Sequence, residues 1–154
     1  MTQAAPTIYS IGHGKQAFAH FLELLAEHEV AFVCDVRSVA RSRWPQYNGR
    51  VLEKLLRENG IGYEHLPECG GKVIAPTADL ARGLDRIIEL AAEMRVAIMC
   101  SESQPLTNHV DPRANCHRVG LLSPPLKARG ARILHILPNG RTIELDESAL
   151  PSIW

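Results

Sequence analysis

Short apolar stretches alternate with amphipathic ones along this chain of 154 residues. The continuous apolar run at 30–36 is typical of a strand that is covered on both faces. Phe18, Phe21 and Leu25 recur at helical spacing, which predicts an amphipathic helix. By the same reasoning, the chain carries further strands at 8–11, 62–66, 96–100 and 133–137 and further helices over 51–56 and 77–91. Because strands and helices alternate, the pattern predicts an α/β fold, with an open, mostly parallel sheet, helices on both faces, three layers and a C-terminal edge hairpin.

Several boundaries of these elements follow from turn and cap residues. We expect Thr77 to cap the helix that follows it. We expect Asn115 to cap a helix that begins at Cys116, and the Pro124-Pro125 pair to break that helix, with Ser123 capping a further turn. Residues 141–145 are expected to pair back on the last long strand.

Composition places the chain among globular proteins with one domain over residues 1–154. Hydrophobic residues make up 45% and charged residues 22%, which excludes a disordered tail, a collagen-like fibre and a small disulfide scaffold. No apolar run approaches the roughly 18–20 residues of a membrane span. The first residues carry no secretory signal, so we expect a cytoplasmic protein that does not associate with membranes.

The formal net charge is zero, but the charges are unevenly distributed. Segment 36–52 contains four arginines and no acid, and segment 112–143 contains six Lys or Arg residues and no acid. Such asymmetry favours a basic cleft that binds an anion.

Reactive and polar residues follow three of the predicted strands. They lie at 12–14, 35–38 and 100–102, and Cys116-His117-Arg118 begins the helix beside the third. Ligands of open α/β sheets bind beyond the carboxyl ends of the strands, so we expect these segments to form one site.

A nucleophilic thiol is the first chemistry that these residues suggest. Cys116 lies at a predicted helix N-terminus beside His117 and Arg118, features that favour a thiolate. Cys100 is followed two residues later by Glu102, a possible general acid or base. Neither cysteine has the arginine six residues on that phosphate-cradling cysteine phosphatases place there.

Two other chemistries remain open. Arg37, Arg41 and Arg43 flank Trp44, a combination that suits a phosphate and a stacked base. Zinc held by Cys100 and Cys116 with His117 is the alternative, although the spacing of the cysteines fits no standard finger. Asp35, at the end of an apolar strand, needs a partner, and it can orient a loop, hold Arg37 or His13, or act on a substrate.

The ordered motifs of the chain resemble a protein family known as domain of unknown function 488, or DUF488. The motifs run from about residue 7 to about residue 137: Ile11-Gly12-His13, Asp35-Val36-Arg37-Ser38, Ser42-Arg43, Gly60-Ile61-Gly62-Tyr63, Cys100-Ser101-Glu102, Cys116-His117-Arg118 and His135-Ile136. Ala40 replaces a usual proline, and Cys69 replaces a usual leucine before Gly70-Gly71, which argues against a shared role for Cys69. The resemblance implies an α/β fold and supports a site at the strand ends, and it leaves the reaction open.

The sequence therefore favours a small enzyme that acts on a phosphate-bearing substrate, a nucleotide or a nucleic-acid end. Its expected catalytic residues are Cys100, Glu102, Cys116, His117 and Arg118. Its expected substrate-binding residues are His13, Asp35, Arg37, Ser38, Ser42 and Arg43, with the anion held by Arg37, Arg43 and Arg118. The alternatives are a non-catalytic nucleotide- or nucleic-acid-binding module that uses Trp44, and a structural metal site. The cofactor and the oligomeric state stay open.

Overall fold

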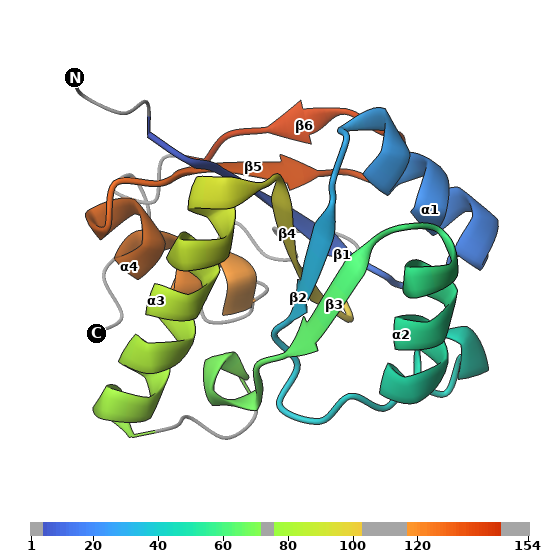
Figure 1. The fold of residues 1–154 in the computed structure, drawn as a ribbon, viewed down its shortest axis with the longest axis horizontal. Helices are drawn as coiled ribbons and strands as arrows, with labels where there is room; N and C mark the ends of the chain where they lie inside the picture. The colour runs from blue at the N-terminus through green and yellow to red at the C-terminus, as the bar shows by residue number, and fades with distance from the viewer. Residues whose placement is uncertain (1–4, 72–75, 103–116, 146–154) are drawn as a thin grey trace, which may run out of the picture.

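A six-stranded mixed sheet forms the centre of the computed structural model, with strand order β3-β2-β4-β1-β5-β6 (Figure 1). The structure describes residues 5–71, 76–102 and 117–145. The first five strands are parallel to their neighbours, and β6 pairs antiparallel with β5. The strands are β1 (Thr7–Gly12), β2 (Phe32–Asp35), β3 (Gly62–His65), β4 (Val96–Cys100), β5 (Arg132–Ile136) and β6 (Thr142–Ile143). The predicted α/β fold is thereby confirmed.

Helices follow the strands as the alternating pattern predicts. The α-helices are α1 (Phe18–Glu27), α2 (Gly49–Glu58), α3 (Thr77–Glu93) and α4 (Ser123–Ala128). The shorter turns are the 3-10 segments η1 (Pro45–Tyr47) and η2 (Pro67–Cys69) and the π-helical segment η4 (Arg118–Leu122). Within the described ranges, no helix has the length and hydrophobicity to cross a bilayer.

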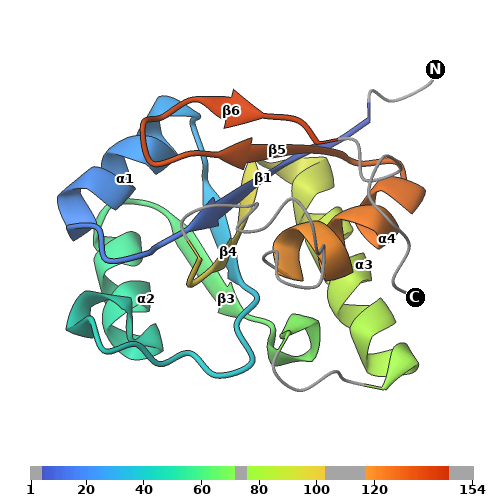
Figure 2. The same ribbon diagram turned by 180° about the vertical axis from the view of Figure 1, so that it is seen from behind.

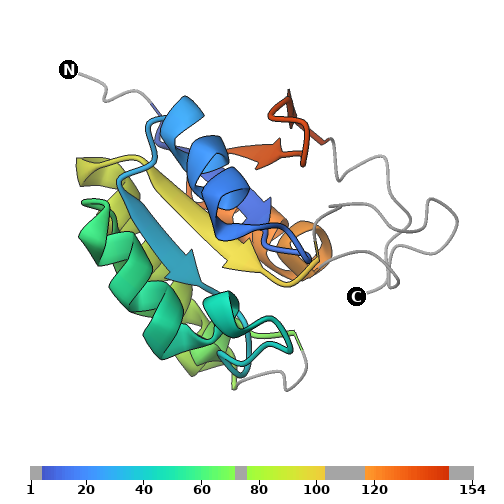
Figure 3. The same cartoon turned by 90° about the vertical axis from the view of Figure 1, so that its right-hand side faces the viewer.

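Two hydrophobic cores lie on opposite faces of the sheet. One core joins the sheet to α1 and α2 through Phe21, Leu25 and Leu52. The other joins it to α3 and η4–α4 through Ile87 and Leu122. Figures 2 and 3 show these helix pairs on either side of the strands. Successive residues of a strand point to opposite faces, which explains why the apolar runs of the buried strands supply both cores.

The connections change face around β4. Helices α1 and α2, which follow β1 and β2, cover one face, whereas α3 and α4 cover the other. Strand β4 lies between β1 and β2. The helix that follows β4 covers one face of the sheet, and the helices that follow β1 and β2 cover the other. Such a switch point is where open α/β sheets bind ligands at the carboxyl edge.

The C-terminal helix differs from its prediction. Pro124 and Pro125 do not break it, because they occupy its first turn, where backbone N–H groups need no helical partner. Ser123 does not cap this turn through its side chain. Its Oγ donates instead to the carbonyl of Arg118 at 2.5 Å, and its N–H bonds the same carbonyl across the π turn.

Two other boundaries are also corrected. Pro76 holds the N-cap position of α3, and Thr77 is the first helical residue rather than the cap. The edge hairpin forms, but β6 contains only two residues. The predicted cap at Asn115 lies outside the described residues.

Candidate active site

The ends of β1, β2 and β4 meet at the carboxyl edge of the sheet. Gly12 is in register with Cys100, and Asp35 is in register with Met99. The pairing continues past the strands, because the N–H of His13 donates to the carbonyl of Cys100 at 3.0 Å. The predicted convergence of these three distant segments is therefore observed.

A buried aspartate organises the first group of polar residues, which we call the aspartate cluster: Asp35, Arg37, Tyr63 and His13. Arg37 donates from Nε to Oδ1 of Asp35 at 2.8 Å and from Nη2 to Oδ2 at 2.6 Å. Tyr63 donates its hydroxyl to the same Oδ2 at 2.5 Å. The carboxylate thus satisfies one side of the guanidinium, which is the arrangement that a buried ion pair requires.

His13 completes this cluster as a neutral imidazole. Its Nδ1 donates to the carbonyl of Gly14 at 2.7 Å, which leaves Nε2 as an acceptor 3.4 Å from Nη1 of Arg37. The ring stacks on Tyr47 with centroids 4.4 Å apart. Burial is the main cause that lowers the pKa of His13, and the nearby guanidinium of Arg37 acts in the same direction.

A buried arginine organises the second group, which we call the cysteine cluster: Cys100, Arg118, Ser10 and His135. Arg118 is fully buried and donates from Nε to Sγ of Cys100 at 2.9 Å. Its Nη1 donates to Oγ of Ser10 at 2.5 Å, and its Nη2 donates to the carbonyl of Glu102 at 2.6 Å. Oγ of Ser10 lies 2.8 Å from Nδ1 of His135. A guanidinium held against a sulfur favours the thiolate form.

The two clusters lie on opposite faces of the sheet. Tyr63 belongs to the core under α1 and α2, and Asp35 shares that face because it lies two residues after Val33. Cys100 belongs to the core under α3 and α4, and Ser10 lies two residues after Ile8 on that face. They approach each other at the carboxyl edge, where the charge of Arg118 further lowers the pKa of His13.

Residues 17–78 match the protein family described as "Domain of unknown function DUF488". Over this segment the chain is similar to DUF488. The matched segment includes the motifs at 35–38, 42–43 and 60–63, so it carries most of the aspartate cluster. The cysteine cluster lies outside it. No curated protein and no solved structure matches the chain.

The loop after β2 lies within the segment that matches DUF488 and contains three predicted substrate-binding residues, Ser38, Ser42 and Arg43. Ser38 packs so closely against Gly70 that any side chain at position 70 would collide with Ser38. Ser42 donates its N–H to Oδ1 of Asn48 at 2.8 Å and accepts the N–H of Trp44 on Oγ at 3.0 Å. These bonds give Ser42 a local role in the loop, whereas the Arg43 side chain is exposed.

In the described ranges, two predicted catalytic residues form no side-chain bond to the thiol. His117 donates from Nε2 to the carbonyl of Val36 at 2.9 Å, which ties η4 to the loop after β2. Glu102 is exposed, and its contact with the cysteine cluster is through its backbone carbonyl. Cys116 lies outside the described residues. Across the described ranges, no group of three His, Cys, Asp or Glu residues is arranged to hold a metal ion.

The anion-binding role expected of Arg37 and Arg118 stays a prediction, and both guanidinium groups already bond groups of this chain. Asp35 occupies one side of the Arg37 guanidinium, and three groups of this chain occupy that of Arg118. Arg43, the third residue expected to bind the anion, is exposed and forms no ion pair with any described residue.

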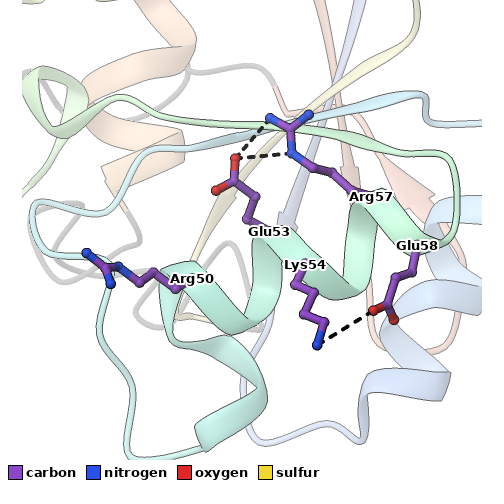
Figure 4. A pocket seen from close by; sticks show the side chains of 5 residues that line it. All are labelled: Arg50, Glu53, Lys54, Arg57 and Glu58. Atoms are coloured by element: carbon purple, nitrogen blue, oxygen red, sulfur yellow. Dashed lines mark hydrogen bonds and ion pairs between the residues drawn. The ribbon is translucent and has the colours of Figure 1, made fainter.

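A surface depression over α2 lies away from both clusters (Figure 4). Its lining residues are Arg50, Glu53, Lys54, Arg57 and Glu58. Arg57 pairs with Glu53 at 2.9 Å, and Lys54 pairs with Glu58 at 4.0 Å, both one helical turn apart. These are exposed ion pairs of a solvated helix face, and they add no reactive group.

Ser10, Tyr63 and His135 are the members of the clusters that sequence reasoning did not assign to the site. Ser10 and His135 are polar positions inside apolar strands, and both are fully buried. That signal was present in the sequence, because a buried polar side chain needs a hydrogen-bond partner. The register that pairs Ser10 with His135 is visible only in the folded sheet.

Proposed function

We propose that this DUF488-like chain is a small cysteine-dependent enzyme, in which the thiolate of Cys100 attacks a phosphate-bearing substrate. The single observation that carries the proposal is the contact of 2.9 Å between Nε of Arg118 and Sγ of Cys100. A fixed positive charge beside the sulfur makes it a better nucleophile at neutral pH. Cys100 is the last residue of β4, next to exposed Ser101 and Glu102, which puts it where such folds bind ligands.

The proposed reaction is a two-step displacement. The Cys100 thiolate attacks phosphorus, an S–P bond forms, and the bond from phosphorus to the leaving oxygen breaks while that oxygen takes a proton from solvent water. Water then attacks phosphorus, the S–P bond breaks to return the thiolate, and the Glu102 carboxylate takes the proton from the water. General acid–base help of this kind contributes roughly a hundredfold or more.

The loop after β2 supplies the proposed contacts to the anion. Arg41 and Arg43 are exposed and form no ion pair among the residues described in the structure. Trp44, beside them, is 36% exposed, a large apolar surface on which a base can stack. These side chains support a nucleotide or a nucleic-acid end as the substrate.

Turnover on a defined panel tests this proposal. The full chain is incubated with nucleoside monophosphates, nucleoside triphosphates and phosphorylated single-stranded oligonucleotides, and release of phosphate is measured. We expect Cys100→Ser to reduce turnover to background and Glu102→Gln to reduce it roughly a hundredfold. Cys69→Ala is the matched control, since that cysteine packs in the core beside Gly83. Equal turnover by Cys100→Ser and the unaltered chain would reject the proposal.

A non-catalytic binding module is the second candidate, favoured by the exposed side chains of Arg41, Arg43 and Trp44. Binding of a fluorescent single-stranded oligonucleotide, measured over a range of salt concentrations, separates the two. If Arg43 contacts a phosphate, Arg43→Ala should reduce the salt slope by about 0.7. Binding that survives Cys100→Ala, without turnover of any phosphate ester, would favour this module over the enzyme.

A further inference from the structure

We propose that Ser10 and His135 are positioning residues that hold the Arg118 guanidinium against the sulfur of Cys100. The inference rests on the proposed function of Cys100 as the nucleophile. Ser10 is hydrogen-bonded to Arg118, and His135 is hydrogen-bonded to Ser10, so both act on the reacting sulfur through Arg118.

Adjacent strands place the two residues side by side. Ser10 in β1 is in register with His135 in β5, and both are fully buried on the α3–α4 face. Oγ of Ser10 lies 2.5 Å from Nη1 of Arg118 and 2.8 Å from Nδ1 of His135. The contacts form a continuous chain from His135 through Ser10 and Arg118 to Cys100.

The direction of each proton along this chain follows from the chemistry of the groups. Arg118 has only donors, so Oγ of Ser10 accepts from it. The hydroxyl proton of Ser10 then needs an acceptor, and Nδ1 of His135 is the acceptor within reach. When Nδ1 is the acceptor, a neutral His135 ring carries its proton on Nε2. A neutral ring also avoids placing a second positive charge near Arg118 in a buried cluster.

The consequence is a guanidinium that is fixed in orientation. Three of its nitrogens have separate partners, namely the sulfur, Ser10 and the Glu102 carbonyl. Loss of the Ser10 contact removes one of these partners, so the plane is held less firmly and the bond from Nε to the sulfur weakens. Because a charge-assisted hydrogen bond depends steeply on geometry, the thiolate of Cys100 is then less favoured.

The ultraviolet absorbance of the thiolate at neutral pH tests this role directly. For each variant, the signal of Cys100 is the difference from the same variant carrying Cys100→Ser. His135→Asn and His135→Leu form a matched pair of similar size, because the side-chain oxygen of Asn can replace Nδ1 as acceptor and Leu cannot. Ser10→Ala removes the middle link. Tyr63→Phe removes a buried hydrogen bond on the other face and controls for general loosening.

We expect Ser10→Ala and His135→Leu to lower the Cys100 thiolate signal about threefold or more, with His135→Asn and Tyr63→Phe close to the unaltered chain. Circular dichroism identifies any variant that fails to fold. If Ser10→Ala fails to fold, the comparison of His135→Asn with His135→Leu decides the result. An unchanged signal in His135→Leu would overturn the inference and leave the proposed function standing. Absence of a Cys100 thiolate in the unaltered chain would overturn both.

Discussion

Two buried arginines stand at the same edge of the sheet, and their surroundings differ. The guanidinium of Arg37 lies against the carboxylate of Asp35, which balances its charge. The guanidinium of Arg118 directs its Nε at the sulfur of Cys100. In the aspartate cluster, the positive charge of Arg37 stabilises a loop. In the cysteine cluster, the positive charge of Arg118 contacts a sulfur that can react.

The comparison shows that burial alone does not identify a reactive residue. The pKa of Cys69 is raised to about 12, mainly by burial, and that of Cys34 is raised further, also mainly by burial. Both therefore stay protonated and unreactive. Cys100 is as buried as they are, and what distinguishes it is the guanidinium on its sulfur.

The largest expected effect on stability is in the aspartate cluster. Asp35→Asn keeps the shape of the side chain and leaves the Arg37 charge uncompensated inside the protein. We expect the free energy of unfolding to fall by about 3–5 kcal/mol, measured by urea denaturation. Glu53→Gln, which breaks an exposed pair on α2, should change it by less than about 1 kcal/mol. A loss for Asp35→Asn as small as that control would remove the structural role of this cluster.

A smaller loss is expected from Tyr63→Phe. The substitution removes the hydroxyl that donates to Oδ2 of Asp35, while Arg37 still pairs with the carboxylate. We expect a loss of about 1–3 kcal/mol in the same denaturation experiment. The reactivity of Cys100 should not change, and a parallel drop in that reactivity would show that the clusters are coupled.

The smallest effect is a pH dependence from His13. Its pKa in the folded chain is lowered, mainly by burial, from an ordinary value of 6.5. Below that value the unfolded chain takes up a proton that the folded chain does not, so the free energy of unfolding falls as the pH falls. Above it both states are neutral and the contribution of His13 vanishes.

His13→Asn isolates this contribution, because the Asn amide can still donate to the carbonyl of Gly14. Its free energy of unfolding should decline less than that of the unaltered chain between about pH 7 and about pH 5. An equally steep decline would assign the pH dependence to the other histidines.

The sequence predicted the parts of this architecture that depend on local pattern. Alternation of strands and helices predicted the sheet, and the rule for strand ends brought His13, Asp35 and Cys100 to one edge. The spacing of Asp35 and Arg37 also allowed the ion pair that the structure contains.

The remainder depended on contacts between distant segments. The apolar runs around Ser10 and His135 concealed a polar contact that exists only because β1 and β5 are paired. Pro124 and Pro125 indicated the end of a helix. In the structure a π-helical segment precedes them, and they lie in the first turn of α4. Neither outcome is encoded in the spacing of residues along one segment.

The alkylation rates of the individual cysteines test the central claim most directly. The full chain is treated with iodoacetamide at neutral pH, and labelling of Cys100, Cys34 and Cys69 is followed by peptide mass spectrometry, beside Arg118→Lys, which keeps a charge and loses the guanidinium plane. The account predicts that Cys100 reacts at least about tenfold faster than the other two, and that Arg118→Lys removes most of this advantage. Equal rates for the three cysteines, or an undiminished rate for Cys100 in Arg118→Lys, would contradict it.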